Sequence, residues 1–384
     1  MFIRLLPSMK TLPKVLLTDA AKDARVLAKS LKSKNIFPPS YRSKTYFRDL
    51  TTHEYFDALI LVRHYLKAAS DEYFGKILKA RNIDLFMLTP CISSPMGPGS
   101  DSEAVPIKFG KHDSYLVDSS QFGFEPLLFQ GIEKVYCYLP SMRGENPDAR
   151  HLNQFFHCEA EIIGTLEDLM PIIEGYIKVL SSMMIALEPL VSRMSRNPYS
   201  TRKTLRNIVT SNSFKRISFG KAYGILRSSN STAKYTEKTK FGRQISSDGE
   251  RFLAQREGDS LPIWMHGFDR DAVPFYQKPD PKDESKVINA DLLFPPITKK
   301  GFSGEIVGSG QRQDDPKEMK ESLRRQGISP KPYKWYIDLR RQRGYRTTSG
   351  FGLGIERFIA WSLGYENIRD VILYPRLKNV VTMP

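Results

Sequence analysis

Apolar positions along the chain follow two different periods, and each period predicts its own kind of element. Apolar residues recur at helical spacing from residue 55 to about residue 80, and residues 82–90 then form an apolar run that ends at Pro90. This order predicts a helix followed by a buried strand, because proline cannot continue a hydrogen-bonded ladder. A second long helix is expected after Thr165, because Thr165 and Asp168 have the spacing of a helix-capping box.

Most of the remaining apolar patches are short and predict strands. Strands are expected at residues 115–120, 134–140, 155–163, 261–265, 272–277, 287–294 and 304–308, and helices at residues 316–326 and 355–363. Helices are inserted unevenly among runs of strands, without a regular strand and helix alternation. We therefore predict an α+β fold built on a mainly antiparallel sheet.

The first fifty residues differ from the rest of the chain. They are rich in Lys, poorly periodic, and contain the breaker stretch Phe37-Pro38-Pro39-Ser40. We expect residues 1–50 to form a basic N-terminal extension, either an arm or a small helical element. Residues 51–384 are then expected to form one large domain.

The composition argues against a membrane-spanning protein and against a scaffold held together by disulfides or zinc. The hydrophobic content of 40% is typical of a globular protein, and the most apolar segment, residues 172–190, is interrupted by Glu174, Lys178 and Glu188. That segment is therefore expected to be a packed helix, because a membrane span needs about 18 uninterrupted apolar residues.

The cysteine content argues against a disulfide scaffold and against a zinc module. The three cysteines are Cys91, Cys137 and Cys158, and none has CxxC or metal-ligand spacing. A reducing, intracellular compartment fits this usage. The first sixteen residues carry Arg4, Lys10 and Lys14 without an acid, which faintly resembles an organelle-targeting peptide but is poor in Ser and Arg. The predicted compartment is the cytoplasm.

The net charge of +16 indicates a surface that attracts polyanions such as nucleic acid, nucleotides or an acidic carrier protein. Residues 193–243 hold thirteen Lys and Arg against the single acid Glu237, a net charge of +12. We interpret the segment of about 193–245 as a basic, insertion-like segment. It is either a nucleic-acid footprint or a solvated insert.

Residues 142–161, MRGENPDARHLNQFFHCEAE, carry the groups that adenylate formation needs. That reaction requires a cation on the α-phosphate, a second donor near the departing pyrophosphate, and a flat face for adenine. Arg143, His151 and Phe155 offer these groups on a strand, loop and strand element. Taken alone, an Arg and a His in a polar loop are more often ordinary surface residues.

Residues 350–357, GFGLGIER, run straight into a predicted helix. The G-x-G-x-G spacing is neither a Rossmann fingerprint nor a P-loop, since no Gly-Lys-Ser/Thr follows. The functional interpretation is close packing of the backbone against a nucleotide, with Arg357 directed at phosphate. The simpler interpretation is a tight strand-to-helix turn with an exposed Arg.

Together, and in this order, the two segments resemble motifs 2 and 3 of class II aminoacyl-tRNA synthetases. The stretches LRRQRG, GFGLGIERF and LGYENIRDVILYPR are similar to the C-terminal end of the asparaginyl and aspartyl enzymes, and residues 55–90 resemble motif 1. The resemblance covers about residues 55–376 and is strongest to the asparaginyl branch. It implies a six- or seven-stranded antiparallel sheet flanked by helices, with residues 51–384 as the catalytic domain and motif 1 as a homodimer interface.

The same resemblance implies roles for individual residues in binding ATP, Mg²⁺ and an amino acid whose carboxylate attacks the α-phosphate in line. By matched position, Arg143 and Arg357 would hold the α- and γ-phosphates, Glu145 and Phe155 the adenine, His151 the γ-phosphate, and Asp291 and Glu305 the Mg²⁺ that the phosphates share. A pair of exposed acids is the alternative for Asp291 and Glu305. No side chain is expected to act as a nucleophile.

The resemblance also bears on the choice of amino acid. In SSQFGFEPLL, Gln121 matches the amino-acid-contacting Gln of this subgroup, and Phe124 stands where the aspartyl enzymes use a Lys to neutralise the substrate carboxylate. A buried carboxylate without its cation is costly, so an uncharged, asparagine-like side chain is favoured. Arg312, in GEIVGSGQR, matches the Arg that grips the substrate side chain in both enzymes.

Three departures from the family pattern concern the substrates. Pro98 stands where the family has a Glu that binds the substrate ammonium, which leaves Glu159 and Gln121 as candidates. Thr348-Ser349-Gly350 replaces His-Gly-Gly, and the spacing from Asp291 to Glu305 is longer than usual. The anticodon-binding OB-fold is expected to be missing, because fifty residues cannot form its five-stranded barrel.

Three functions remain open from the sequence. The first is a ligase that activates asparagine or a close analogue as an aminoacyl-adenylate and transfers it to an acceptor, with tRNA as the family default. The second is a tRNA-independent, amide-forming ligase, either asparagine synthetase-like or acylating a small amine or a carrier protein. The third is an inactive paralogue with a regulatory or RNA-binding role, against which the retained phosphate-binding residues argue.

Overall fold

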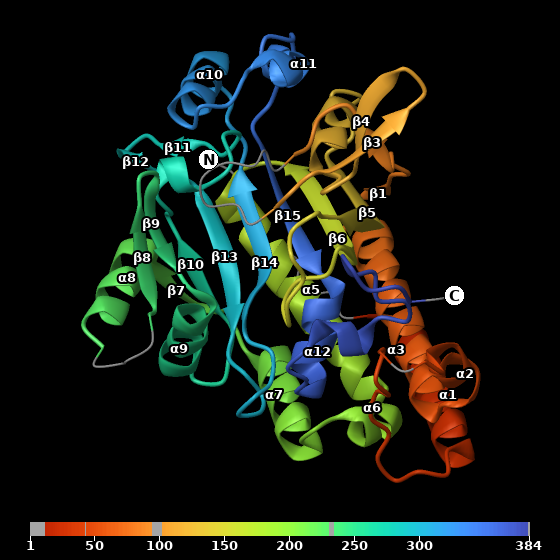
Figure 1. The fold of residues 1–384 in the computed structure, drawn as a ribbon. Helices are drawn as coiled ribbons and strands as arrows, with labels where there is room; N and C mark the ends of the chain where they lie inside the picture. Colours follow the sequence, from red (N-terminus) through yellow and green to blue (C-terminus); the bar gives the residue numbers. More distant parts are fainter. Residues whose placement is uncertain (1–11, 43, 94–101, 230–233, 383–384) are drawn as a thin grey trace.

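The computed structural model of the chain describes residues 12–42, 44–93, 102–229 and 234–382 (Figure 1). Pro98, Arg4 and Lys10 lie outside the described residues, so the predictions that rest on them stay predictions. The described residues combine one large mixed sheet with helices on its faces and edges. The predicted α+β class is confirmed.

The secondary structure follows the chain in this order. The helices are α1 (Lys14–Ser30), α2 (Tyr46–Thr52), α3 (Glu54–Asp71), α4 (Glu125–Leu128), α5 (Leu166–Ala186), α6 (Glu188–Met194), α7 (Pro198–Thr210), α8 (Phe219–Arg227), α9 (Ser247–Glu257), α10 (Pro316–Arg325), α11 (Lys334–Leu339) and α12 (Ile355–Leu363). The strands are β1 (Arg81–Asn82), β2 (Leu88–Thr89), β3 (Val105–Phe109), β4 (His112–Leu116), β5 (Lys134–Met142), β6 (Gln154–Ile163), β7 (Lys215–Ser218), β8 (Thr236–Thr239), β9 (Gly242–Ile245), β10 (Ile263–His266), β11 (Pro279–Asp280), β12 (Asp283–Val287), β13 (Asn289–Phe294), β14 (Gly304–Gln311) and β15 (Thr348–Gly354).

The main sheet has eight strands in the order β1-β5-β6-β15-β14-β13-β10-β7. The inner strands from β5 to β10 pair antiparallel, and only the two outermost strands, β1 and β7, pair parallel to their neighbours. The sheet therefore has more strands than the six or seven expected, because it includes the short edge strands β1 and β7. The antiparallel centre brings β6 and β15, which are almost 200 residues apart in sequence, side by side (Figure 1).

Alternation along β6 assigns its side chains to the two faces of the sheet. Cys158, Ala160 and Ile162 are buried in the main hydrophobic core, which also contains the apolar face of α5. The intervening side chains, from Phe155 to Glu161, therefore point to the opposite face, because successive residues of a strand point to opposite sides. That opposite face carries the polar site described below.

Helix α5 covers the apolar face of the sheet, where Figure 1 shows it passing behind β14 and β15. Its start is the predicted capping box: the Thr165 side chain accepts from the Asp168 N–H and the Asp168 carboxylate accepts from the Thr165 N–H. Among the described residues, α5 alone is long and apolar enough to cross a membrane, and 67% of its most apolar window is buried within the protein. Such burial is the pattern of a core helix.

Residues 12–50 pack onto the rest of the protein. Ala20, Ala24 and Ala28 form the buried stripe of α1, which contacts α3, α5 and α6. The Tyr65 hydroxyl on α3 donates to Asp23 Oδ2 on α1 at 2.6 Å. The breaker stretch also has a contact, because the Arg196 guanidinium lies over the Phe37 ring at 4.0 Å. Whether residues 1–50 form a unit of their own stays a prediction.

Two expected strands are wrong. Residues 82–90 contain the end of β1, which pairs with β5, and the whole of the two-residue strand β2, which pairs with β4. Between these strands the described backbone makes isolated bonds, from Ile83 N to Tyr136 O and from Val117 N to Met87 O. Residues 272–277 form a short turn and a loop, in which Gln277 makes one isolated bridge. Ile83 and Leu85 are partly buried against a small cluster and Phe86 is exposed, whereas Phe275 and Tyr276 are buried.

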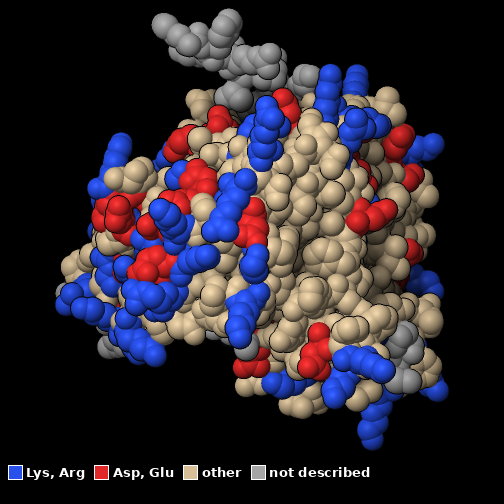
Figure 2. All heavy atoms as spheres, turned by 90° about the horizontal axis from the view of Figure 1, so that it is seen from above, with Lys and Arg blue, Asp and Glu red and all other residues tan. Residues whose placement is uncertain are grey.

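The basic segment is ordered around the edge of the main sheet. Residues 193–229 and 234–243 form α7, β7, α8 and β8 and the start of β9, and β7 is itself the outermost strand of the sheet. Seen from above, Lys and Arg atoms on the side of α8, β8 and β12 are interspersed with Asp and Glu atoms (Figure 2). The positive charges of the basic segment are therefore partly balanced by acidic residues from elsewhere in the chain.

Candidate active site

A row of glycines forms the floor of the site. Gly350, Gly352 and Gly354 on β15 pair with Glu161, Glu159 and His157 on β6. On the other side of β15, Gly350 and Gly352 pair with Gly310 and Gly308 of β14. Because cross-strand partners lie on the same face, the glycines of β14 and β15 leave side-chain room over the middle of the sheet, beside the polar side chains of β6. The G-x-G-x-G pattern therefore opens a hollow between the flanking polar side chains.

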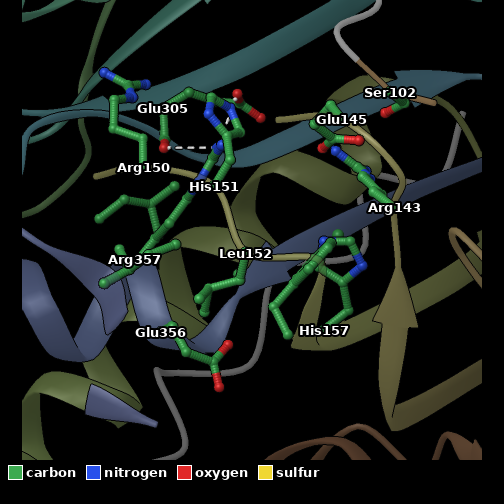
Figure 3. A pocket seen from close by; sticks show the side chains of 15 residues that line it. Ser102, Arg143, Glu145, Arg150, His151, Leu152, His157, Glu305, Glu356 and Arg357 are labelled. Atoms are coloured by element: carbon green, nitrogen blue, oxygen red, sulfur yellow. Dashed lines mark hydrogen bonds and ion pairs between the residues drawn. The ribbon is translucent and has the colours of Figure 1, made fainter. Parts of the chain in front are cut away.

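A first cavity of about 260 Å³ lies over one end of this floor. Its lining includes all six residues that the sequence predicts for ATP binding: Arg143, Glu145, His151, Phe155, Glu305 and Arg357. Figure 3 shows Arg143, Glu145 and Ser102 on one side of the cavity and Arg150 and Glu305 on the other. Arg143 and Arg357, 214 positions apart in the sequence, thus share one hollow.

Two guanidinium groups are anchored at the β14 side of this cavity. Arg357, in the first turn of α12, lies 3.1 Å from Glu305 Oε2 and donates to Glu305 O at 3.2 Å (Figure 3). Arg150 forms an ion pair with Glu250 at 2.8 Å and donates to Ser303 O at 3.0 Å. Each guanidinium is held in place by a carboxylate and a backbone carbonyl, so both are positioned to donate to the oxygens of a triphosphate.

The loop between β5 and β6 positions the remaining cations. Asn153 Nδ2 donates to Arg143 O at 2.7 Å and to Glu145 O at 2.8 Å, which fixes the start of the loop. The Arg143 guanidinium lies over the Phe155 ring at 5.2 Å. His151 Nδ1 is 2.8 Å from Asp148 Oδ1, so a carboxylate of the same loop orients this ring.

A second cavity of about 200 Å³ adjoins the first along the glycine floor. Arg143, His157, Glu305 and Gly352 line both cavities. The second cavity also contains the residues predicted to contact the amino acid, Gln121, Glu159 and Arg312, together with Asp291. Two connected hollows with a common wall can hold two substrates whose reacting groups meet at that wall.

A buried ion pair forms the far end of the second cavity. Arg312 Nη2 lies 2.7 Å from Glu161 Oε2 and Arg312 Nε lies 2.9 Å from Glu161 Oε1. Burial disfavours the charged guanidinium, but the Glu161 carboxylate outweighs that effect and raises the pKa of Arg312 above its usual range. The charge of Arg312 is therefore already balanced within the protein.

Two carboxylates at the common wall lie side by side. A Cβ atom placed on Gly308 would be 3.2 Å from Glu305 Oε1 and 3.6 Å from Asp291 Oδ1, so both oxygens converge beside this glycine. Burial and the charges of Glu305 and Glu250 raise the pKa of Asp291 well above its usual range. For Glu305, burial is outweighed by Arg357 and Arg150, which lower the pKa.

This pair of oxygens suits a hard cation. No group of three or more His, Cys, Asp or Glu side chains arranged for a metal occurs within the part of the chain that the structure describes. Mg²⁺, however, is commonly held by one or two carboxylates when substrate phosphates complete its shell. The uncompensated negative charge at Asp291 is the feature that fits such an ion.

His157 is a neutral side chain at the common wall. Its Nδ1 lies 3.0 Å from Ser141 Oγ, and its ring packs edge-on against Phe155 with centroids 4.6 Å apart. Burial and the charges of Arg143 and Arg357 lower the pKa of His157 well below its usual range. Glu159, next to it on the same face, accepts from Ser120 N at 2.7 Å and from the Ser119 hydroxyl.

Several site residues are absent from the sequence-based prediction. Arg150, His157, Glu161, Glu250, Tyr276 and Gln277 belong to this list. A signal exists for His157 and Glu161, because Phe155, His157, Glu159 and Glu161 alternate along one predicted strand and so share a face. The other four residues come from segments whose position depends on tertiary packing.

Comparison with known proteins gives a family and sequence relatives. A family model for class II tRNA synthetases (D, K and N) matches residues 41–378. The chain is 35% identical over 272 residues to the asparagine–tRNA ligase of Pyrococcus furiosus, covering 70% of this chain and 58% of that protein. It is 32% identical over 354 residues to the asparagine–tRNA ligase of Mycoplasma genitalium, covering 88% and 72%. The chain therefore spans little more than half the length of the Pyrococcus relative.

Solved structures agree with this similarity. The asparaginyl-tRNA synthetase of Pyrococcus horikoshii, complexed with asparaginyl-adenylate, superposes with a TM-score of 0.74 and 27% identity, covering 97% of this chain and 74% of that one. The asparaginyl-tRNA synthetase of Entamoeba histolytica in complex with asparaginyl-adenylate gives a TM-score of 0.71 and 25% identity, covering 93% and 75%. Both likenesses extend over nearly the whole chain.

Proposed function

The chain belongs to the class II tRNA synthetases of the D, K and N group, and on that premise we propose that it activates asparagine with ATP. The product is asparaginyl-adenylate, which then passes its acyl group to an acceptor. The observation that carries this proposal is the pair of cavities that meet at Arg143, His157, Glu305 and Gly352. An amino acid in one cavity and ATP in the other would face each other at that wall.

The reaction needs no protein nucleophile. A carboxylate oxygen of the amino acid forms a bond to the α-phosphorus, and the bond from that phosphorus to the pyrophosphate oxygen breaks. Arg143 at the common wall balances the charge that develops on the α-phosphate, while Arg357 and His151 hold the γ-phosphate. Glu145 and Phe155 hold the adenine. Neutral His157 adds a hydrogen-bonding group without further positive charge.

We propose Asp291 and Glu305 as the residues that hold Mg²⁺. Their oxygens converge beside Gly308, and the raised pKa of Asp291 reports negative charge that the protein leaves unbalanced. A bound Mg²⁺ ion would neutralise phosphate charge as the pyrophosphate departs. Arg357 pairs with Glu305, so this arginine connects the carboxylates to the phosphate region.

The ion pair at the far end of the second cavity supports asparagine over aspartate. A substrate carboxylate there would meet Arg312, whose charge is already balanced by Glu161 at 2.7 Å. The net charge available to a second anion is small, whereas a neutral carboxamide needs only hydrogen bonds. Phe124 is buried and supplies no cation.

Exchange of labelled pyrophosphate into ATP, measured over a panel of amino acids, tests the proposed activity. Asparagine should support exchange, and Arg357→Ala should reduce it by about 10²- to 10³-fold with the fold intact, because one donor to a developing charge is worth that much. Arg341→Ala is the matched control, since Arg341 is exposed and pairs with the partly exposed carboxylate of Asp338, outside both cavities. Full activity of Arg357→Ala would remove the assigned phosphate role.

We propose tRNA as the acceptor, with the basic segment as part of its binding surface. Five of its thirteen cations form ion pairs: Arg202 with Glu188, Lys215 with Glu257, Arg216 with Glu167, Lys234 with Glu237, and Arg243 with Asp269. Lys203 and Arg206 on α7 make no ion pair in the described part of the chain, so they are better candidates for phosphate contacts.

Charge reversal tests whether the basic segment binds tRNA or is only a solvated surface. Lys203→Glu with Arg206→Glu should weaken tRNA binding and lower the slope of log affinity against log salt by about 2. The control is Lys108→Glu with Lys111→Glu at the exposed β3–β4 hairpin, which changes the net charge equally. Equal effects of the two double variants would make the basic segment a solvated surface.

A tRNA-independent, amide-forming ligase is the second candidate. The partial pairing of the basic segment favours it, because fewer free cations remain for a polyanion. Exchange with aspartate, together with amide formation that depends on ammonia, would support this candidate over the first. Absence of exchange with every amino acid would instead favour an inactive paralogue.

The oligomeric state, the domain boundaries and the compartment are also part of the proposal. We propose a homodimer formed through α3, whose outer face leaves Ile60 half exposed, and sedimentation or light scattering would measure its mass. Residues 51–384 would be the catalytic domain, residues 1–50 a basic extension, and about 193–245 an insertion-like segment. The cytoplasm is the proposed compartment.

A further inference from the structure

Gln277 lies at the far end of the second cavity, in the loop that precedes β11. The loop is fixed along the end of β14, because Lys278 N donates to Gln311 O at 2.9 Å and Gln313 N donates to Tyr276 O at 2.7 Å. Gln277 itself forms an isolated bridge with Arg312. Backbone contacts on both sides therefore hold the position from which the Gln277 side chain extends.

The side-chain amide of Gln277 lies on the glycine floor. A Cβ atom on Gly310 would be 3.2 Å from Gln277 Cδ and 3.4 Å from both Oε1 and Nε2, so the amide packs directly over this glycine. Within the described residues, Gln277 Oε1 is buried and has no hydrogen-bond donor. An unpaired buried oxygen costs about 1–3 kcal/mol. A ligand or a water molecule in the cavity is the available source of a donor.

The order of glycines along β15 identifies the part of the ligand that reaches Gln277. Gly354 lines the first cavity, Gly352 lines both cavities, and Gly350, the partner of Gly310, lines only the second. Two residues of a strand span roughly 6.8 Å. An amino acid with its carboxylate at the common wall keeps its α-amino group near that wall. Its side-chain end then lies near Gly310.

The charges around Gln277 disfavour an anionic substrate side chain. Arg312 is balanced by Glu161, and the remaining acids of the cavity, Glu159 and Asp291, would oppose a second carboxylate. The lone oxygen of Gln277 accepts hydrogen bonds, so its complement is an N–H group. A primary carboxamide offers that group without bringing a charge.

We propose that Gln277 is a specificity-determining residue whose Oε1 accepts a hydrogen bond from the side-chain NH₂ of a carboxamide substrate. The assignment rests on the proposed function, because it places the amino acid in the second cavity. It adds a contact from a loop that the predicted amino-acid site of Gln121, Glu159 and Arg312 does not include. The substrate class is an α-amino acid with a short primary amide.

Two variants of Gln277 test whether its side chain accepts or donates the hydrogen bond to the substrate. Gln277→Leu removes the acceptor and should raise KM for asparagine in pyrophosphate exchange by about 10- to 100-fold, with KM for ATP unchanged. Gln277→Glu keeps an acceptor oxygen and should retain most of the affinity for asparagine. Equal losses in the two variants would show that Gln277 donates, or acts only through packing, and would overturn the proposal.

A substrate analogue identifies the ligand group. Aspartate β-methyl ester is uncharged at its side chain and lacks the NH₂ group. The wild-type protein should prefer asparagine to this ester, and Gln277→Leu should lose most of that preference. If Gln277 contacted the α-ammonium instead, the variant would weaken asparagine and the ester by the same factor, which contradicts the proposal.

Controls separate this proposal from the proposed function. Gln130→Leu makes the same change at an exposed position outside the cavities and should leave every parameter unchanged. Melting curves should show that both Gln277 variants are folded, with Gln277→Leu no less stable than the wild type, because it removes the unpaired oxygen. Exchange by the wild type with asparagine, together with an unaffected Gln277→Leu, would refute only the role of Gln277. Absence of wild-type exchange with every amino acid would refute the proposed function and this role together.

Discussion

Replacing Gly350 by Ala should disrupt the buried pair at the end of the amino-acid cavity. The new Cβ would stand 2.8 Å from Glu161 Cδ, and closer still to Glu161 Oε2 and Arg312 Nη2. Glu161 is fully buried and Arg312 nearly so, and each holds the other in place. The backbone of Gly350 is not in the left-handed region, so alanine itself causes no strain in the main chain.

The expected loss of stability follows from that contact. Separating a buried ion pair costs about 3–5 kcal/mol, and overpacking that moves the pair as a unit costs about 1–3 kcal/mol. Alanine in place of glycine recovers roughly 0.4–1 kcal/mol by restricting the unfolded chain. The net expectation is a decrease of about 2–4 kcal/mol in the free energy of unfolding.

Urea denaturation of Gly350→Ala measures this decrease, and Gly352→Ala is the matched control. Gly352 lies two residues along the same strand and the same face, but its Cβ would come no closer than 3.4 Å, to Glu159 Oε1. Both variants place a methyl group in the cavity, so stability distinguishes them better than activity does. Equal stability of the two variants would refute the inference that Glu161 and Arg312 are held tightly together.

Two further predictions concern carboxyl groups whose pKa burial raises. Asp291→Asn should raise the free energy of unfolding at pH 7, because it removes a carboxylate whose charge Glu305 and Glu250 oppose, and it should raise the Mg²⁺ concentration that exchange requires. A less stable variant in urea denaturation would contradict this. Burial raises the pKa of Asp370 to about 6, against the opposing charges of Arg196 and Arg369. The folded-state pKa therefore exceeds the unfolded value of about 3.9. Asp370 lowers the free energy of unfolding as the pH rises from the unfolded pKa to the folded pKa. Asp370→Asn should then stabilise the protein by about 1–2 kcal/mol at pH 8 but not at pH 4, and equal effects at both pH values would refute the shift.

Local signals in the sequence predicted the structure correctly where a single helix or its cap determines it. The capping box at Thr165 and the helix at residues 355–363 form as predicted, because a cap and an apolar stripe act within a few residues. The single strand expected at residues 82–90 is divided between two short strands, β1 and β2, which pair with different neighbours, and the strand expected at residues 272–277 does not form. Apolar content alone does not distinguish a strand from a packed loop.

The sequence by itself determined part of the set of groups that the site contains. The alternation from Phe155 to Glu161, the spaced glycines at 350, 352 and 354, and Arg357 are all visible in the printed chain. Only the tertiary structure decided what they face, because the register of β6, β15 and β14 sets each glycine opposite a long polar side chain and joins two hollows at Gly352. The pairing of Arg312 with Glu161 and the position of Gln277 over Gly310 depend on contacts between segments far apart in the chain, for which no local pattern exists.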